Sequence, residues 1–284
     1  MKSLLAITSF LILLAASLSA AERFPKLDDT DWGWWRGPNH NGIAAASAQP
    51  PLTWDDNTNI RWQAEIPGRG HSSPTVVGDR VFLTTANEVK QTQHVLCFDR
   101  STGDVLWNKE IYQGNFDHNN NKNSFASSSV SCDGQQIYTS FFRDKKILTV
   151  ALTLKGKLVW EHVYGGFASH QGFGASPLLY KRMVILAADN KADGGGLLTA
   201  VDRQNGEILW ETPRPKCPNY VSPTIYHLNG RDELLMAGCE IIASYNPDTG
   251  KPNWEYDGTT EEVVGDVATD GKYIFASGGY PKRE

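Results

Sequence analysis

The segment FDRSTGDVLWNKE, residues 98–110, contains a pattern that returns three times along the chain. In most copies an aspartate or asparagine begins a turn and a glycine ends it; in every copy a tryptophan follows the glycine by four residues. The later copies read TLKGKLVWEH at 153–162, VDRQNGEILWET at 201–212 and YNPDTGKPNWEY at 245–256. The chain is therefore built from repeated units. The recurring residues are Asp99, Gly103, Trp107, Gly156, Trp160, Asp202, Gly206, Trp210, Asn246, Gly250 and Trp254.

The tryptophans set the length of each unit. Together with Trp62, which reads as the end of an earlier unit, they are spaced by 45, 53, 50 and 44 residues. Between them lies a second recurrent segment, which reads as a strand, a polar turn and another strand. Each unit therefore holds about four strands. The copies are HSSPTVVGDRVFLTT at 71–85, FASSSVSCDGQQIYTSF at 125–141, GASPLLYKRMVILAA at 174–188, YVSPTIYHLNGRDELLMAG at 220–238 and GDVATDGKYIFASGG at 265–279.

Four short strands per unit predict an all-β fold, a β-propeller of four-stranded antiparallel blades. A single twisted blade cannot cover its own two apolar faces, whereas radial stacking covers both. The fifth unit ends after its second strand, with ASGGYPKRE. We therefore expect about four and a half blades, and a propeller that is incomplete at its C-terminus.

The repeated tryptophans have two interpretations. A large apolar ring at a fixed distance after a turn favours packing against the neighbouring blade, because blades carry periodic aromatic motifs. The alternative is a row of tryptophans that binds carbohydrate. The fixed spacing favours the structural interpretation.

The pattern D-x-x-T-G-x-x-x-W resembles the tryptophan-docking repeat of the pyrroloquinoline-quinone (PQQ) propeller superfamily. This quinoprotein dehydrogenase-like superfamily includes alcohol dehydrogenases and the propeller lipoprotein of the outer-membrane assembly machinery. WWRGPNHNG at 34–42 and EIPGRGHSSPTVVGDRVFLT at 65–84 resemble, more specifically, the exported PQQ-like β-propeller repeat proteins of planctomycete-type bacteria. The resemblance covers residues 31–284 and implies a ring of about seven or eight blades. For the enzymes of the superfamily, it implies PQQ and calcium on the axis.

The N-terminus predicts export. Lys2 precedes an apolar run from Leu4 to Ala16, and small residues end at Ala21. This is the pattern of a cleaved signal peptide, with an uncleaved anchor as the alternative. We expect a signal peptide at 1–21, an N-terminal strap at 22–61 and the propeller at 62–284. The mature protein is then periplasmic or extracellular, without an integral membrane segment.

The strap carries an unusual cluster of aromatic residues. Trp32, Trp34 and Trp35 lie within four positions and are followed by the turn-forming residues 36–38. A membrane-interface belt needs a spanning segment beside it, and the only apolar run is the signal. We expect these tryptophans to cover a blade face or the seam where a ring closes.

Composition excludes one class of partner. The 284 residues are 40% hydrophobic and 21% charged, and the formal net charge is -5. No block of basic residues occurs, so the sequence argues against nucleic-acid binding.

Export makes disulfides chemically available to the four cysteines, which are Cys97, Cys132, Cys217 and Cys239. Asn229-Gly230 predicts a hairpin between the last two, which brings Cys217 and Cys239 to roughly opposite positions. A disulfide between them and two separate buried thiols are both compatible with this placement.

The loops that lead into the first strand of each unit are polar and contain three of the seven histidines. In a propeller these loops gather at one rim around the axis, where polar groups from separate blades can bind a ligand. The alternative is a solvated surface without a ligand. The candidate ligand-binding residues are Arg69, His71, Asp117, His118, Asn123, His170, Gln171 and Asn219.

Signatures of catalysis are missing from the sequence. It contains no G-x-S-x-G, phosphate loop or H-E-x-x-H motif. Calcium prefers several oxygen ligands, and the nearest carboxylates, Asp117 and Glu262, do not form a recognisable set. The histidines at 71, 118 and 170 lack the short spacing of known metal sites. We therefore predict no catalytic residue, no metal and no cofactor; PQQ and calcium are implied by the resemblance alone.

These observations favour an exported, non-catalytic propeller that acts as a binding or scaffold module through its polar rim. The partner would be a protein, a small molecule or a carbohydrate. Two alternatives stay open. One is a PQQ-dependent alcohol or sugar oxidoreductase of the quinoprotein type, and the other is a carbohydrate-binding propeller.

Overall fold

The computed structural model describes residues 27–117 and 119–279, and the regular structure of these residues is β-strand. Four four-stranded antiparallel sheets follow one another along the chain, and a two-stranded sheet ends the series. We call them blades 1 to 5. Blade 1 holds β1 (Thr75–Val77), β2 (Arg80–Asn87), β3 (Thr92–Asp99) and β4 (Val105–Gln113), and blade 2 holds β5 (Ser131–Cys132), β6 (Gln136–Arg143), β7 (Lys146–Thr153) and β8 (Leu158–Gly165).

The remaining blades repeat this order, so the predicted all-β architecture of four-stranded blades is confirmed. The three glycines at 194–196 lie at the turn between two strands of blade 3, as a hairpin loop does. Blade 3 holds β9 (Leu178–Tyr180), β10 (Met183–Ala187), β11 (Gly196–Asp202) and β12 (Ile208–Arg214), blade 4 holds β13 (Thr224–Leu228), β14 (Arg231–Gly238), β15 (Ile241–Tyr245) and β16 (Pro252–Asp257), and blade 5 holds β17 (Ala268–Thr269) and β18 (Ile274–Phe275).

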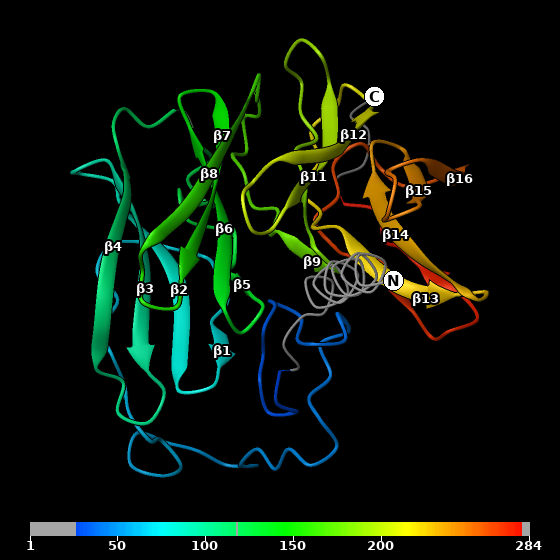
Figure 1. The fold of residues 1–284 in the computed structure, drawn as a ribbon. Helices are drawn as coiled ribbons and strands as arrows, with labels where there is room; N and C mark the ends of the chain where they lie inside the picture. Colours follow the sequence, from blue (N-terminus) through cyan, green and yellow to red (C-terminus); the bar gives the residue numbers. More distant parts are fainter. Residues whose placement is uncertain (1–26, 118, 280–284) are drawn as a thin grey trace, which may run out of the picture.

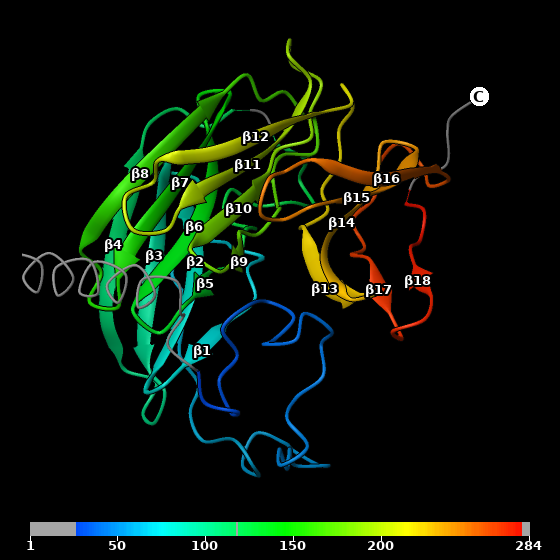
Figure 2. The same ribbon diagram turned by 45° about the vertical axis from the view of Figure 1, so that its right-hand side comes forward.

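The blades are arranged side by side in an arc (Figures 1 and 2). The first strand of each blade lies toward the middle of the arc, and the fourth strands β4, β8, β12 and β16 lie outside. The main apolar clusters contain buried side chains from neighbouring blades, such as Phe142 of blade 2 and Ile185 of blade 3. Burial between adjacent sheets therefore holds the arc together.

The repeated tryptophans dock each blade onto the next. The glycine of the next turn lies against the indole ring, and a Cβ added at Gly103 would lie 2.5 Å from Trp62. The same glycine has a φ of 78°, which side chains rarely adopt. These two constraints explain the constant spacing of the motif within the chain. The indole Nε1 groups donate to backbone oxygens as follows: Trp62 to Arg100 at 2.9 Å, Trp107 to Leu154 at 3.0 Å, Trp160 to Arg203 at 2.8 Å and Trp210 to Pro247 at 3.1 Å.

The first and the last tryptophan of the series, Trp62 and Trp254, each depart from the pattern in one respect. Trp62 docks like the others, although residues 60–66 form no strand in the structure. Trp254 donates instead to Glu233 Oε2 of its own blade, at 2.7 Å. Among the described residues, four of the five repeat tryptophans, those at 62, 107, 160 and 210, therefore dock in this way.

A second set of hydrogen bonds links the blades near the axis. The backbone N–H of Ser73 donates to Ser129 Oγ at 2.8 Å, that of Ser129 donates to Ser176 Oγ at 3.0 Å, and that of Ser176 donates to Ser222 Oγ at 2.9 Å. These serines hold equivalent positions just before the inner strands. In blade 5 the equivalent position is Asp266. The serine ladder therefore fixes the angle between neighbouring inner strands.

The strap crosses the axial side of the arc rather than the outer face of a blade. It contacts the inner strand of blade 1 first, and then reaches blades 2, 3 and 4 in turn (Figure 2). We expected the strap tryptophans at a blade face or at a closing seam, and the strap residues hydrogen-bond to groups at the inner strands of four blades. The contacts are Trp32 N to Val76 O at 2.6 Å, Cys132 N to Gly33 O at 2.9 Å, Trp34 Nε1 to Pro177 O at 2.7 Å and Tyr226 OH to His40 O at 3.1 Å.

The Asn229-Gly230 hairpin forms between β13 and β14, with φ values of 51° and 78° at the two turn residues. Cys217 and Cys239 are joined in a disulfide with a Cα–Cα distance of 5.8 Å. Of the two alternatives compatible with the sequence, the structure has the disulfide. Cys97 and Cys132 are buried free thiols.

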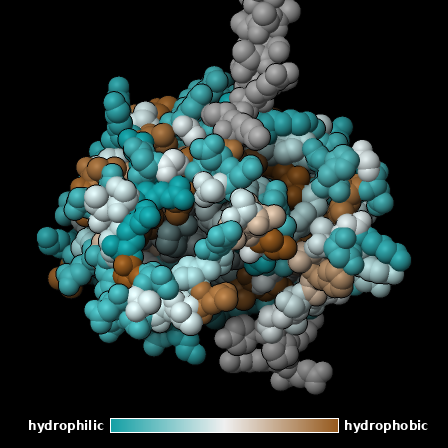
Figure 3. Space-filling view, turned by 90° about the horizontal axis from the view of Figure 1, so that it is seen from below, coloured by the Kyte–Doolittle hydropathy of each residue, from teal (hydrophilic) through white to brown (hydrophobic). Residues whose placement is uncertain are grey.

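The surface seen from below mixes residue types, with hydrophobic residues in several separate patches among hydrophilic ones (Figure 3). This mixture is ordinary for a surface in contact with water. Within residues 27–117 and 119–279, no helix is long and apolar enough to cross a membrane. The predicted signal peptide at 1–21 lies outside the described residues.

Candidate ligand-binding site

Loops from four blades meet around one cavity of 560 Å³, which we call the rim pocket. The loops are those that lead into the inner strands β5, β9, β13 and β17, so the cavity lies at the rim opposite the strap. The predicted convergence of polar loops is therefore present in the structure. The lining residues are Asn120, Lys122, Asn123, Gln171, Gly174, Tyr220, Glu262, Val264 and Gly279.

One wall of the rim pocket is an amide network between blades 2 and 3. Asn123 Nδ2 donates to the backbone oxygen of Gln171 at 2.7 Å, and Asn120 Nδ2 donates to its side-chain Oε1 at 2.5 Å. Asn123 Oδ1 in turn accepts from the Ser124 amide at 2.8 Å. Among the residues that the structure describes, the side-chain NH₂ of Gln171 has no partner. It is therefore available to donate to a ligand.

The opposite wall comes from blade 4 and the segment before blade 5. The hydroxyl of Tyr220 lies 3.0 Å from Ser169 Oγ, and burial raises the pKa of this phenol above its usual value. Glu262 Oε1 lies 3.7 Å from His170 Nε2. Since the Glu262 side chain is only 14% exposed, its carboxylate is held at the wall rather than free in solvent.

Charges around the rim pocket balance. Lys122 and Glu262 both line it, and a second pair of opposite charge, Lys191 and Glu261, lies beside it with Nζ and Oε1 3.2 Å apart. These four side chains carry two positive and two negative charges. A strongly anionic or cationic ligand gains little from such a site, so the electrostatics favour a neutral ligand with several hydrogen-bonding groups.

Two of the predicted rim residues, Asn123 and Gln171, line the pocket. His170 lies just outside it, beside Glu262. The histidine at 118 lies outside the described residues. The structure therefore brings three of the candidates together at one place.

Three other candidates have different roles. Arg69 Nη2 donates to the backbone oxygen of Asn121 at 2.6 Å and so ties two rim loops together. Asp117 Oδ2 accepts from the Lys145 amide at 2.5 Å, at a hairpin of blade 2. The side chain of His71 is exposed and does not line the pocket.

Asn219 is the last candidate, and its side chain points into the protein. It is 6% exposed, and its Nδ2 donates to Asp189 Oδ2 at 3.0 Å and to the Ala237 backbone oxygen at 2.7 Å. Its Oδ1 accepts from the Val263 amide at 3.3 Å. With these partners Asn219 supports the wall of the pocket from behind and does not face a ligand.

A family model named PQQ_2, with the description "Outer membrane protein assembly factor BamB", matches residues 26–166 and 91–282. The chain belongs to the PQQ_2 family. This membership agrees with the tryptophan docking and with the four-stranded blades, and it confirms the resemblance to PQQ-like propellers.

Relatives of this PQQ_2 chain include a polyvinylalcohol dehydrogenase from a Pseudomonas species, which is 27% identical over 299 residues. The match covers 89% of this chain and 43% of the relative, so the chain spans less than half of that protein's length. Among solved structures, a quinohemoprotein alcohol dehydrogenase from Comamonas testosteroni matches with a TM-score of 0.51 and 17% identity, over 72% of this chain and 39% of the other. BamB from Moraxella catarrhalis matches with a TM-score of 0.38 and 15% identity, over 75% of this chain and 68% of the other.

The resemblance to PQQ enzymes implies a calcium ion, so the described residues can be tested as its ligands. Glu262 is the one carboxylate among the residues that line the rim pocket. Asp117, the other carboxylate considered, is engaged by a backbone amide elsewhere. In the part of the chain that the structure describes, no three His, Cys, Asp or Glu side chains gather as metal ligands. Because calcium takes six to eight oxygen ligands, usually with several carboxylates, this donor set does not fit it.

The pocket also contains residues that were not selected from the sequence as ligand-binding candidates, among them Asn120, Lys122 and Tyr220. The first two lie in the same polar loop as Asn123, and Tyr220 follows Asn219 directly. The loop was therefore recognisable, whereas the direction of each side chain was not. Glu262 and Val264 belong to the loop before blade 5, and the sequence singled out Glu262 only as a carboxylate candidate for calcium binding.

Proposed function

We propose that this PQQ_2 chain is an exported, non-catalytic binding module that holds its ligand in the rim pocket. The observation that carries the proposal is the convergence of loops from four blades on one cavity of 560 Å³. Propeller rims place groups from separate blades around a single site, and such convergent cavities are where proteins bind small molecules. The family description, an assembly factor, also agrees with a protein partner at the same rim.

The chemistry of the pocket favours a neutral ligand rich in hydroxyl groups. The amide NH₂ of Gln171 offers donors, the carboxylate of Glu262 offers acceptors, and the ring of Tyr220 offers an apolar surface. A polyol or a sugar unit presents hydroxyls that both donate and accept, and C–H faces that contact aromatic rings. The balanced charges of the wall support the same class.

Isothermal titration of the full chain with sorbitol, maltotriose, cellotriose and a short poly(vinyl alcohol) tests the proposal. We expect saturable binding of at least one probe, weakened about tenfold by Gln171→Ala, which removes a hydrogen-bonding amide from the wall. His71→Ala is the matched control, because His71 lies at the rim but outside the pocket. If none of the four probes binds, or if His71→Ala weakens binding as much as Gln171→Ala, this assignment fails.

A quinoprotein-type alcohol or sugar oxidoreductase is the second candidate. The observation that favours it is the similarity to a polyvinylalcohol dehydrogenase over 89% of this chain. The test is dye reduction by the full chain supplied with PQQ, calcium and ethanol, glucose or poly(vinyl alcohol). Turnover that depends on the added quinone would replace the non-catalytic proposal. Binding without turnover would favour the binding module.

A further inference from the structure

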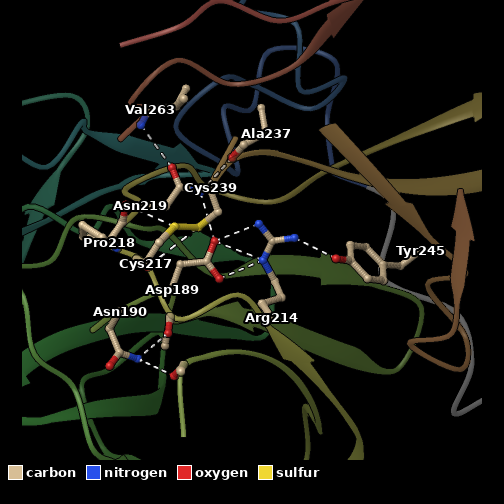
Figure 4. Close-up of polar contacts among 12 residues, drawn as sticks. Asp189, Asn190, Arg214, Cys217, Pro218, Asn219, Ala237, Cys239, Tyr245 and Val263 are labelled. Carbon is tan, nitrogen blue, oxygen red and sulfur yellow. Dashed lines mark hydrogen bonds and ion pairs between the residues drawn. A yellow bond between two sulfur atoms is a disulfide. The ribbon is translucent and has the colours of Figure 1, made fainter. Parts of the chain in front are cut away.

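We propose that five residues behind the rim pocket, Asp189, Arg214, Cys217, Asn219 and Cys239, form a clamp that positions the Tyr220 and Glu262 wall. The proposal rests on the proposed function, which makes Tyr220 and Glu262 part of a binding site. The positioning of these two residues by the clamp can nevertheless be tested without any ligand. Figure 4 shows the disulfide, the ion pair and Asn219 side by side.

The ion pair of the clamp lies at one end of blade 3, where Asp189 follows β10 and Arg214 ends β12. Arg214 Nε lies 2.8 Å from Asp189 Oδ1, and Arg214 Nη2 lies 2.9 Å from Asp189 Oδ2. The two side chains are 0% and 1% exposed. Arg214 Nη1 also donates to Tyr245 OH at 2.7 Å. A bidentate pair without solvent access has little freedom to reorient, so it fixes the position of Asp189 Oδ2.

Asn219 links Asp189 of blade 3 to blade 4. One of its amide hydrogens is directed to Asp189 Oδ2 and the other to the backbone oxygen of Ala237. Its Oδ1 accepts from the Val263 amide, and the amide of Tyr220 donates to the Val263 backbone oxygen at 3.1 Å. Asn219 therefore connects blade 3, blade 4 and the segment before blade 5 through a single side chain.

The disulfide between Cys217 and Cys239 belongs to the same cluster as Asn219 and the ion pair. The amide of Cys239 donates to the Glu261 backbone oxygen at 2.9 Å. Cys239 and Glu240 have φ values of 59° and 67°, which are unusual for residues other than glycine. Such a turn persists only where its surroundings determine it, and here the bond to Cys217 and the strand-like contacts to residues 258–261 do so.

The clamp lies one residue behind the pocket wall. Asn219 precedes Tyr220, and both Glu261 and Val263, which bond to the clamp, flank Glu262. If the clamp loosens, the two wall residues move relative to the amide wall on blades 2 and 3. Asn219 and the disulfide are therefore positioning residues, which hold the pocket in its binding shape before a ligand arrives.

Hydrogen exchange of the full chain measures how firmly the clamp holds the segments that carry Tyr220 and Glu262. Reduction with a phosphine adds two electrons and two protons to the disulfide and leaves two thiols, while the phosphine takes an oxygen atom from water and becomes its oxide. We expect exchange to become about tenfold faster in peptides covering 218–222 and 259–264, at a temperature where the circular dichroism is unchanged. Peptides covering 119–124, on the amide wall, should keep their rates. Reoxidation should restore the original pattern.

Two variants separate positioning from general stability. Asn219→Ala should reproduce the local acceleration with the disulfide intact. The matched control is Arg203→Met, because Arg203 pairs with Asp133 at 2.7 Å in a second buried ion pair, on the strap side. The control should lower the melting temperature without selective exchange at 218–222 and 259–264.

Unchanged exchange at both segments after reduction and in Asn219→Ala would overturn the clamp, as would equal acceleration in all blades. If the exchange pattern is as expected and no probe binds, the clamp holds and the proposed function fails. If a probe binds, its affinity should fall on reduction in proportion to the local opening.

Discussion

The indole Nε1 of Trp160 donates to the backbone oxygen of Arg203, which lies 43 residues later in the chain and in the next blade. The same ring lies against Gly206, the glycine that ends the turn of that blade. One side chain therefore supplies both the apolar contact and the hydrogen bond that join two blades. The same geometry recurs at Trp62, Trp107 and Trp210, so the docking unit is a repeated link between sheets.

Replacing the docking glycine tests this link. A Cβ at Gly206 would lie 2.9 Å from Trp160, and the residue has a φ of 76°. We expect Gly206→Ala to lower the free energy of unfolding in urea by about 2–4 kcal/mol, from backbone strain and displacement of the ring. Gly230→Ala is the control, since its φ is 78° but nothing lies within 4 Å of its Cβ, so about 1 kcal/mol is expected. Equal losses would mean that backbone strain alone matters.

The fold was predictable because its signals are local and repeated. The turn before each tryptophan, the Asn229-Gly230 hairpin and the two-strand segments all depend on neighbouring residues. Side chains that reach another blade were not predictable in this way. Asn219 was expected at the rim because it is polar and lies in a loop, but its partner Asp189 comes 30 residues earlier and is itself fixed by Arg214.

The serine ladder illustrates the same limit. Its members occur in the recurrent segments as Ser73, Ser129, Ser176 and Ser222, but a serine before a strand has many ordinary roles. Only the packing of the blades shows that the hydroxyls of Ser129, Ser176 and Ser222 each accept a hydrogen bond from the blade before them. The sequence alone therefore did not show that Asp266 of blade 5 occupies the position that serine holds in the other blades.

Asp266 predicts a pH dependence of stability. Burial raises the pKa of this carboxyl from 3.8 to about 7, while the Arg36 guanidinium and the Ser222 amide oppose the shift. Tyr226 is a further titratable group near it. In the part of the chain that the structure describes, neither carboxylate oxygen has a hydrogen bond of normal geometry. A group with a raised pKa in the folded state binds protons there more tightly than in the unfolded chain, so the contribution of Asp266 to stability falls as pH rises from about 4 to 7.

Asp266→Asn should therefore stabilise the protein at pH 8 by about 1–3 kcal/mol, because a neutral amide carries no penalty for a buried charge. At about pH 2.5 the folded and unfolded carboxyls are both almost fully protonated, and the gain should nearly vanish. Urea unfolding at the two pH values measures the difference. Asp56→Asn, at an exposed position, is the control and should change neither value. A gain of the same size at both pH values would exclude titration of Asp266 as the cause.

The export prediction concerns residues outside the described structure and can be checked directly. The apolar run from Leu4 to Ala16 and the small residues ending at Ala21 predict cleavage before Glu22. Expression of the full chain in a bacterium, followed by fractionation and N-terminal sequencing, should give a periplasmic or secreted protein that begins at Glu22. Retention of Lys2 on a membrane-bound product would support the uncleaved anchor instead. A Leu13→Arg change should block export by breaking the apolar run.

The strap tryptophans should differ sharply in their effect on stability. Trp34 is 4% exposed, joins an apolar cluster with side chains from blades 2, 3 and 4, and donates to the Pro177 backbone oxygen at 2.7 Å. Trp34→Ala should lower the free energy of unfolding by about 3–5 kcal/mol, through a cavity and an unpaired carbonyl. Trp54 is 68% exposed, so Trp54→Ala should cost less than about 0.5 kcal/mol. Urea titration followed by fluorescence compares the two. A small loss for Trp34→Ala would mean that the strap does not hold the inner strands together.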